Sequence, residues 1–312
     1  MVLIMDHSFQ WQGRQDGKGA EHQRIFHIVN QSDLADFAIL GFSSDEGVRR
    51  NRGRIGAAKA PDLIRKQLAN LPVHASVHIH DLGTVICLNG ELEQAQAMLA
   101  QQVEHALHQG LKPIVFGGGH EIAYGSFSGI FHYVQNTQPN KSIGIINFDA
   151  HLDLREETQA TSGTPFLQAA KLCKTHAKAF HYLCIGVAQH SNTKKLFDTA
   201  ANLGSQYIFD HELEPTQLER ILMQIDQFIQ AVDWLYITVD LDVFSASIAP
   251  GVSAPAVRGI DLKIFEKIMQ HIQRSGKIKL LDIAECNPKY DQDAMTARLA
   301  AFIAYSYMFG EQ

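Results

Sequence analysis

An α/β fold with a mainly parallel sheet is predicted by two features of the sequence. Short apolar or β-branched runs alternate with segments in which apolar residues have helical spacing. The runs are almost continuously apolar, as expected of parallel strands that helices cover on both faces. Eight runs are typical of strands: Phe37–Gly41, Val77–Asp81, Pro113–Phe116, Ile143–Asp149, Tyr182–Val187, Tyr207–Phe209, Trp234–Asp240 and Lys279–Glu285.

Helical segments separate these strands, and no linker interrupts the alternation. Residues 1–30 are polar and rich in glycine, and no internal repeat or Gly/Ser-rich stretch divides the remainder. We therefore expect an N-terminal arm over residues 1–35 and a single domain over residues 36–312. The predicted helices are Ala57–Leu68, Leu92–His108, Glu121–Tyr133, Thr193–Ala201, Leu218–Ile229, Leu262–Gln273 and Ala294–Met308.

The composition excludes several classes of protein. Of 312 residues, 46% are hydrophobic and 19% are charged, which is typical of a globular chain and not of a disordered one. The net charge of -6 argues against a surface that binds nucleic acid. No apolar run reaches about 18 residues, so we expect no membrane span. The 4 cysteines form no C-x-x-C pair, which fits a reducing, cytoplasmic location.

Residues that can carry chemistry follow four of the predicted strands. These strands run into Gly-Gly-Gly-His-Glu at 117–121, Asp-Ala-His-Leu-Asp at 149–153, Asp-Leu-Asp at 240–242 and Glu-Cys-Asn-Pro at 285–288. In an open α/β sheet, ligand sites form at the carboxyl ends of the strands. We therefore expect these side chains to meet at one rim of the sheet.

The spacing of the acids and histidines predicts a metal centre. Asp149, His151 and Asp153 alternate, so in extended backbone they share one face, and Asp240 and Asp242 do the same. Several aspartates in one pocket repel each other unless cations neutralise them. Oxygen and imidazole ligands without a thiolate favour Mn²⁺. Together with His120 they make six ligands, which suit two ions about 3.5–4 Å apart.

Each of these motifs also has another interpretation. A single Asp-x-Asp at a strand end is more often a helix cap or a turn residue than a ligand, whereas Asp-Ala-His-x-Asp favours a ligand by itself. The combination of four such motifs is what indicates a joint site. The run Gly117–Gly119 lacks the Lys-Ser/Thr of a phosphate-binding loop, so we expect it to let backbone pass close to the ions. The chain has no Gly-x-Ser-x-Gly motif, which argues against a serine hydrolase.

The combined motifs resemble those of the arginase/agmatinase/formimidoylglutamase family of binuclear manganese ureohydrolases. The resemblance rests on residues 117–121, 147–153, 238–242 and 284–288 and extends from about Asp36 onward. It implies a three-layer α/β/α fold with an eight-stranded parallel sheet and two Mn²⁺ ions. It also implies that Glu285 pairs with the cationic end of the substrate and that Asp153 relays a proton. The implied ligands are His120, Asp149, Asp153 and Asp240 for one ion, and His151, Asp149, Asp240 and Asp242 for the other.

Departures from the family pattern favour its formimidoylglutamase branch. The loop Thr161–Phe166 lacks the His-Gly pair of arginases and agmatinases, Ser245 replaces a third acid, and Arg155 stands where arginases have an asparagine. Residues 11–17, 47–56, 249–255 and 296–300 are also similar to this branch. The resemblance therefore implies hydrolysis of N-formimidoyl-L-glutamate to L-glutamate and formamide in histidine degradation.

The small-molecule substrate implied by this resemblance has two carboxylates in its tail. Arg155 is the preferred clamp because arginine binds a carboxylate through two parallel hydrogen bonds, and Ser162 is a further donor. The basic stretch Arg49–Arg54 and Arg258 are weaker candidates, for which a solvated surface cluster is an equal interpretation. Two other functions stay open: a guanidino-acid amidinohydrolase that releases urea, and a metal-binding protein without turnover. The family resemblance also implies a homo-oligomer.

Overall fold

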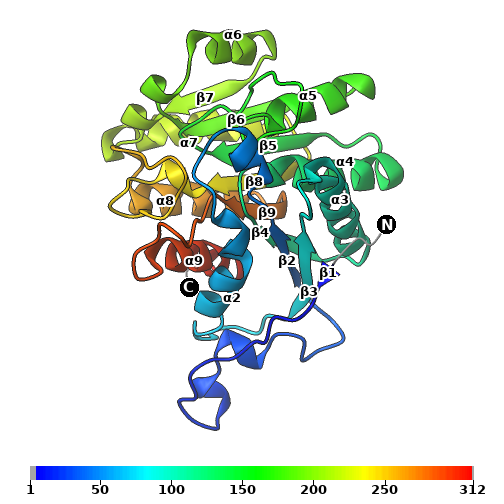
Figure 1. The fold of residues 1–312 in the computed structure, drawn as a ribbon, viewed down its shortest axis with the longest axis vertical. Coiled ribbons are helices and arrows are strands. Elements are labelled where there is room, and N and C mark those ends of the chain that lie inside the picture. The colour runs from blue at the N-terminus through cyan, green and yellow to red at the C-terminus, as the bar shows by residue number, and fades with distance from the viewer. Residues whose placement is uncertain (1–4, 311–312) are drawn as a thin grey trace.

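A single sheet runs through the computed structural model, which describes residues 5–310 (Figure 1). Within these residues the sheet has nine strands in the order β1-β3-β2-β4-β9-β8-β5-β6-β7. All neighbouring strands are parallel except β1, which pairs with β3 in the antiparallel direction. The strands are β1 (Met5–Asp6), β2 (Phe37–Ser43), β3 (Ile79–Ile86), β4 (Lys112–Phe116), β5 (Ile143–Phe148), β6 (His181–Val187), β7 (Gln206–Phe209), β8 (Trp234–Asp240) and β9 (Ile278–Ala284).

Helices pack on both faces of the sheet and make the predicted three layers. One face packs against α2, α7, α8 and α9, and the other against α3, α4, α5 and α6, each with its own apolar core. The α-helices are α1 (Glu46–Arg50), α2 (Ala60–Leu68), α3 (Leu92–His108), α4 (Ile122–Thr137), α5 (Pro165–Thr175), α6 (Lys194–Asn202), α7 (Leu218–Gln230), α8 (Leu262–Arg274) and α9 (Met295–Phe309). Among residues 5–310, none of the helices is long and apolar enough to cross a membrane.

The eight predicted strands all occur, and β1 is an addition. The run predicted at Val77–Asp81 is displaced, because β3 continues past Asp81 and Gly83 to Ile86. Asp81 can lie within this strand because its carboxylate accepts two hydrogen bonds, of 2.9 and 2.8 Å, from the buried guanidinium of Arg65. A paired acid is compatible with a strand near the edge of the sheet, although it interrupts the apolar pattern.

Two helices were not predicted. Helix α1 is only five residues long and lies within the basic stretch. Helix α5 begins within the segment Thr161–Phe166 that lacks the His-Gly pair, with Thr164 at the N-cap position and Pro165 at the first helical position. Proline is favoured at that position because its missing N–H needs no partner there. The Thr-Pro pair was therefore the available signal for α5.

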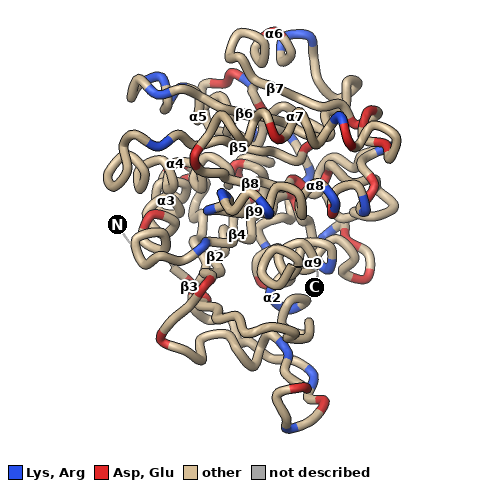
Figure 2. Tube along the Cα trace, turned by 180° about the vertical axis from the view of Figure 1, so that it is seen from behind, with Lys and Arg blue, Asp and Glu red and all other residues tan. Residues whose placement is uncertain are grey.

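The described part of the N-terminal arm is attached to the sheet. It supplies β1, and the segment up to residue 36 extends beyond the sheet edge in Figure 1. Trp11 donates a hydrogen bond from Nε1 to Asp81 Oδ2 at 2.8 Å, so the arm joins the Arg65–Asp81 pair. Acidic and basic residues are interspersed along the chain seen from behind (Figure 2).

The four strands that carry the polar motifs are neighbours in the middle of the sheet. Their order is β4-β9-β8-β5, and the register pairs Phe116 with Ile283, Asp240 with Ala284 and Phe148 with Val239. Parallel strands in this register end at the same rim. The sheet topology therefore brings residues from four distant parts of the chain to one place, as the sequence predicted.

Candidate active site

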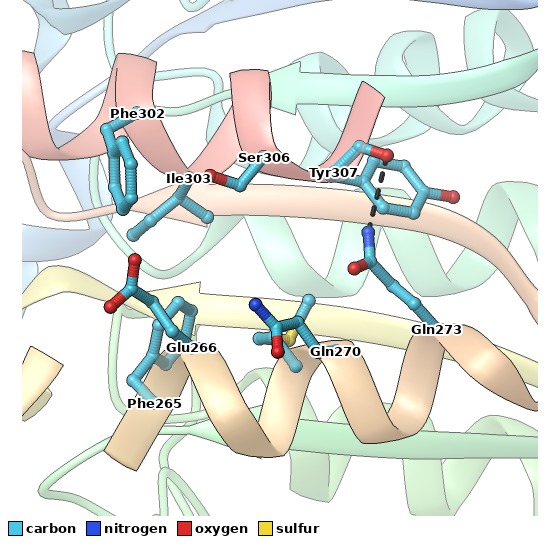
Figure 3. A pocket seen from close by; sticks show the side chains of 9 residues that line it. Phe265, Glu266, Gln270, Gln273, Phe302, Ile303, Ser306 and Tyr307 are labelled. Atoms are coloured by element: carbon cyan, nitrogen blue, oxygen red, sulfur yellow. Dashed lines mark hydrogen bonds between the residues drawn. The ribbon is translucent and has the colours of Figure 1, made fainter. Parts of the chain in front are cut away.

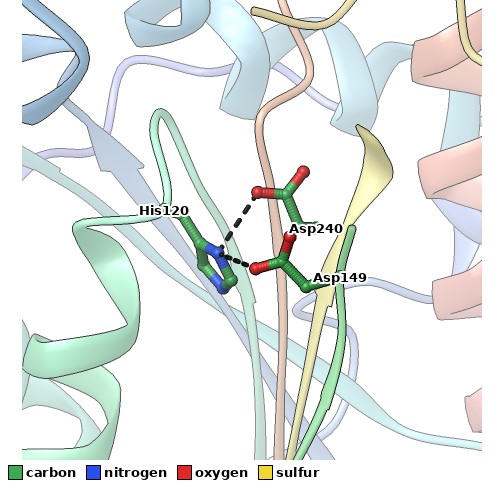
Figure 4. Close-up of side chains that lie close together, drawn as sticks. All are labelled: His120, Asp149 and Asp240. Carbon is green, nitrogen blue, oxygen red and sulfur yellow. Dashed lines mark ion pairs between the residues drawn. The ribbon is translucent and has the colours of Figure 1, made fainter. Parts of the chain in front are cut away.

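His120 lies at the centre of one half of the candidate site. It follows β4, and its Nδ1 atom is 3.1 Å from Asp149 Oδ2, 3.1 Å from Asp153 Oδ2 and 3.2 Å from Asp240 Oδ2. Figure 4 shows the imidazole facing the carboxylates of Asp149 and Asp240. This buried nitrogen has no aligned hydrogen-bond partner among the described residues. One nitrogen surrounded by three carboxylates is an arrangement that fits a cation held between them.

His151 and Asp242 form the other half of the site and share Asp149 with the first half. His151 Nδ1 is 3.2 Å from Asp242 Oδ2 and 3.4 Å from Asp149 Oδ1. Asp149 therefore directs one carboxylate oxygen toward each histidine. In each half, one ligand atom from each of three residues lies within 4.8 Å of the others: His120, Asp149 and Asp240, and Asp149, His151 and Asp242. Two adjoining groups with a shared carboxylate fit a pair of metal ions.

The site concentrates negative charge away from water. The side chains of Asp149, Asp240 and Asp242 are at most 4% exposed. Burial, together with the charges of Asp242 and Asp149, raises the pKa of Asp240 well above its usual range. Burial also favours a higher pKa for Asp149, but contacts with His120 and His151 outweigh it and lower that pKa. Such a cluster is stable in its ionised form only with added positive charge.

The ligand candidates converge through turns and not through extended backbone. Asp149 Oδ1 accepts a hydrogen bond from the His151 N–H at 2.7 Å, and Asp240 Oδ1 accepts one from the Asp242 N–H at 2.8 Å. Asp153 has a left-handed backbone with φ of 47°. The side chains do converge, but the extended backbone expected for these two segments was wrong. Each aspartate that ends a strand instead stabilises the turn that follows it.

Glu285 enters the same cavity from the end of β9 with an unusual backbone conformation. Its φ of 65° lies in the left-handed region, which non-glycine residues rarely adopt and which is often found at functional sites. Its Oε1 atom accepts a hydrogen bond from the His120 N–H at 3.0 Å, whereas Oε2 has no partner among residues 5–310. Burial, together with the charges of Glu121 and Asp242, raises the pKa of Glu285 to about 8.

The glycine run before His120 allows a close approach to the loop after β2. A Cβ atom on Gly118 would lie 1.5 Å from the Ser44 carbonyl oxygen, and one on Gly119 would lie 2.1 Å from Glu121 Oε2. The sequence predicted a close approach to the ions. The contacts in the structure are with the chain itself, and they fix the loop that carries His120.

Two polar residues behind His120 received no role in the sequence analysis. His120 Nε2 is 3.0 Å from Thr238 Oγ1, and a proton on Nε2 directs the lone pair of Nδ1 toward the carboxylates. Asp282 is fully buried in β9 and accepts a hydrogen bond from the Tyr236 hydroxyl at 2.5 Å. An aspartate within an otherwise apolar central strand was the available signal for this buried polar group.

Five of the six candidate ligands and the candidate substrate contacts line one cavity of about 230 Å³, whereas the fully buried Asp149 lies outside its lining. The guanidinium of Arg155 forms no hydrogen bond or ion pair with the described part of the chain, and the residue is exposed. The lining residues are Asn51, Gly53, His120, His151, Asp153, Arg155, Ser162, Ser191, Asn192, Leu196, Asp240, Asp242, Ser253, Ala254 and Glu285. The structure thus brings Arg155 and Ser162 to the predicted metal centre.

All of the weaker substrate candidates except Arg52 contact other parts of the protein instead. Arg50 donates hydrogen bonds to Glu46 at 2.8 Å and to the Ala160 carbonyl oxygen at 2.9 Å. Arg54 donates from Nε to the Ser253 carbonyl oxygen at 2.9 Å. The remaining members are Arg49, which pairs with Glu46, Arg52, which is exposed, and Arg258, which lies 3.4 Å from Asp210. None of these arginines lines the cavity, so they are poor candidates for substrate contacts.

A second hollow lies between α8 and α9, away from the strand ends (Figure 3). It is lined mainly by apolar and amide side chains, among them Phe265, Met269, Phe302 and Ile303. Its volume of about 20 Å³ holds little more than one water molecule. It is too small for a substrate and presents no cluster of acids and histidines.

Comparison with known proteins identifies the family. The sequence profile of the arginase family matches residues 35–310. The chain belongs to the arginase family. Among its relatives, the formimidoylglutamase of Chromobacterium violaceum is 44% identical over 300 residues, covering 95% of this chain and 96% of the relative. The formimidoylglutamase of Aeromonas salmonicida is 45% identical over 308 residues, covering 96% and 97%.

Solved structures agree with this arginase-family fold. The formiminoglutamase of Trypanosoma cruzi with Mn²⁺ superimposes with a TM-score of 0.80 at 22% identity, covering 92% of this chain and 98% of that chain. This likeness confirms the predicted three-layer fold with its mainly parallel sheet.

The metal-free form of this arginase-family protein is expected to become progressively less stable as the pH rises from about 5 to 8. Burial and neighbouring acids raise the pKa of Asp240 and of Glu285, the latter to about 8, so the folded metal-free protein holds protons that the unfolded chain releases near pH 4. The binding of these protons stabilises the folded state fully at a pH below the pKa of the unfolded chain. This contribution is lost as the pH rises through the raised pKa of the folded state.

The melting temperature of the chelated protein, measured from pH 5 to 8, tests this expectation. It should fall with pH, and the stabilisation by added Mn²⁺ should grow over the same range. A melting temperature of the chelated protein that rises from pH 5 to 8 would contradict it.

Proposed function

We propose that this chain hydrolyses N-formimidoyl-L-glutamate to L-glutamate and formamide at a pair of Mn²⁺ ions, as a step of histidine degradation. The observation that carries the proposal is the polarity of the cavity. One part is lined by Asp153, Asp240, Asp242 and Glu285, and the same cavity exposes the guanidinium of Arg155. A substrate with a cationic amidinium and an anionic tail matches the acidic lining at one end and the guanidinium of Arg155 at the other. The names of the relatives support the same activity.

The residues present fit two Mn²⁺ ions. His120 Nδ1 and Asp242 Oδ1 are buried atoms without hydrogen-bond partners among residues 5–310, and both lie in the acidic cluster. Oxygen and imidazole donors without thiolate suit Mn²⁺. One ion would be held by His120, Asp149, Asp153 and Asp240, and the other by His151, Asp149, Asp240 and Asp242. Asp240 contacts the His120 half in the structure, so its contact with the second ion is part of the proposal.

The chemistry divides between the ions and the side chains. When bound, the ions supply Lewis acidity and lower the pKa of water so that hydroxide is available near neutral pH. Glu285 pairs with the amidinium and orients the formimidoyl carbon for attack by hydroxide. The bond from this carbon to the glutamate nitrogen then breaks. Asp153 carries a proton to the departing amine, which leaves formamide and glutamate as products.

Arg155 and Ser162 would bind the carboxylates of the tail. Replacing Arg155 with alanine is expected to raise the KM for N-formimidoyl-L-glutamate by about 10-fold or more, since hydrogen bonds to charged groups are among the stronger ones. The KM for the corresponding diamide, which has no tail carboxylate, should change much less. Steady-state kinetics with both compounds measures the difference. Equal changes for both would remove Arg155 from this role.

A substrate panel tests the proposed activity against its main alternative. The Mn²⁺-reconstituted protein is offered N-formimidoyl-L-glutamate, arginine, agmatine and 4-guanidinobutyrate. Turnover of the first compound alone is the expected result. Urea from a guanidino compound would instead favour a guanidino-acid amidinohydrolase, and metal binding without turnover of any amidine would favour a metal-binding protein.

The proposal also covers the location and assembly of the protein. We place it in the cytoplasm as a homo-oligomer, with residues 36–312 as the catalytic domain and residues 1–35 as its arm. All 4 cysteines are free, which supports a reducing compartment. Sedimentation of the purified protein tests the assembly.

A further inference from the structure

Asn51 lies at the end of α1 and lines the active-site cavity, although the sequence analysis gave it no role. Its side-chain Nδ2 donates a hydrogen bond to Ser162 Oγ at 3.1 Å. The two residues are far apart in the sequence, and Ser162 belongs to the loop that distinguishes this chain from arginases and agmatinases. The hydrogen bond therefore joins two loops directly at the cavity wall.

Both ends of this hydrogen bond are fixed by the surrounding structure. The Asn51 N–H donates to the Gly47 carbonyl oxygen at 2.9 Å, and the Gly47 N–H donates to the buried Glu121 carboxylate at 2.9 Å. Arg50 connects the same segment to the opposite loop through its hydrogen bond to the Ala160 carbonyl oxygen. Asn51 and Ser162 thus meet as preorganised groups.

The direction of the hydrogen bond determines what Ser162 can offer a ligand. A hydroxyl has one proton and two lone pairs, and one lone pair of Ser162 accepts from Asn51. The Ser162 hydroxyl proton has no acceptor among the described residues, and Asn51 keeps a second amide proton. Both protons are therefore available to an acceptor in the cavity.

Arg155 lies beside this pair. A Cβ atom on Gly163 would be 2.7 Å from Arg155 Cδ, so the arginine side chain lies across the backbone next to Ser162. The Arg155 N–H also donates to the Gly163 carbonyl oxygen at 2.9 Å. Asn51, Ser162 and Arg155 form one group of donors, which we call the tail socket.

We propose that Asn51 is a specificity-determining residue that makes the tail socket selective for a carboxylate. It contributes its free amide proton and orients the Ser162 hydroxyl as a donor, so that Arg155 does not act alone. An ionised carboxylate offers acceptors alone and can therefore accept from Asn51, Ser162 and Arg155 together. A primary amide in the same place would also direct N–H protons toward these donors. The inference rests on the proposed function, because it assigns the tail of that substrate.

The test replaces Asn51 with aspartate, which has nearly the same shape but offers carboxylate oxygens in place of the amide protons. The Mn²⁺-loaded variant is expected to show a KM for N-formimidoyl-L-glutamate raised by about 10-fold or more relative to the change for its diamide. Ser162→Ala should shift the same ratio in the same direction. Equal changes for both substrates in N51D would overturn the inference.

The matched control is Asn140→Asp, which introduces the same charge elsewhere. Asn140 is exposed and precedes β5, so it lies at the opposite end of this strand from the site. N140D should keep the wild-type ratio of the two KM values.

Calorimetric measurement of L-glutamate binding to the Mn²⁺-loaded protein tests the role of Asn51 separately from the proposed function, because binding does not depend on turnover. Weaker binding by N51D than by N140D supports the tail socket even if the wild type fails to hydrolyse N-formimidoyl-L-glutamate. In that case the proposed function is wrong and the assignment of Asn51 stands. Equal binding by N51D and N140D would overturn the assignment, whatever the wild type hydrolyses.

Discussion

Replacing Asp149 with asparagine is expected to abolish binding of two Mn²⁺ ions and to lower kcat by more than about 10²-fold. Even residues that only support a metal ligand cost about 10–100-fold when removed, and Asp149 contacts both histidines of the site. An amide also removes the negative charge that the two ions would share. Metal analysis after dialysis and steady-state kinetics measure the two effects.

A surface aspartate provides the control for this variant. Asp198 forms an ion pair with Lys194 on the exposed face of α6, where such pairs contribute little to stability. D198N should therefore bind two Mn²⁺ ions and turn over substrate like the wild type. A D149N protein with two ions and a normal rate would refute the assignment of Asp149 as a shared ligand.

Glu285→Gln is expected to lower kcat/KM for N-formimidoyl-L-glutamate by about 10²-fold or more while leaving the Mn²⁺ content intact. Loss of one partner of a buried charge pair has effects of this size. Glutamine can still accept the hydrogen bond from the His120 N–H, so the loop should keep its position. The effect would come from the missing charge opposite the amidinium.

Kinetics and metal analysis of E285Q, with Glu219→Gln on the exposed surface of α7 as the control, separate these contributions. Loss of Mn²⁺ from E285Q would assign Glu285 to the metal centre. An unchanged kcat/KM would remove it from substrate binding.

The position of the site was predictable because it depends on sheet topology. Apolar runs that end in Asp149 and Asp240 marked two central strands, and parallel strands in register bring their ends together. The backbone conformation between the ligand residues was not predictable from their spacing alone. The sequence pattern is equally compatible with an extended segment, whereas the structure has turns in which each aspartate accepts a hydrogen bond from the chain.

Contacts between distant loops could not be predicted from the sequence. From the sequence, the basic stretch Arg49–Arg54 was a weaker candidate for the substrate clamp. In the structure, Arg50 instead donates a hydrogen bond to the Ala160 carbonyl oxygen and Asn51 donates one to Ser162. Their roles depend on partners more than 100 residues away, and a single sequence has no periodicity that reports such pairs. The two-residue strand β1 was missed for a similar reason, since its pairing with β3 is all that defines it.

The bond that breaks is the most direct test of the account. NMR analysis of the products formed from N-formimidoyl-L-glutamate by the Mn²⁺-reconstituted protein identifies that bond. The account predicts formamide and L-glutamate in equal amounts, because hydroxide attacks the formimidoyl carbon and the glutamate amine departs. N-formyl-L-glutamate with ammonia would show that the other C–N bond breaks, and it would contradict the proposed roles of Asp153 and Glu285.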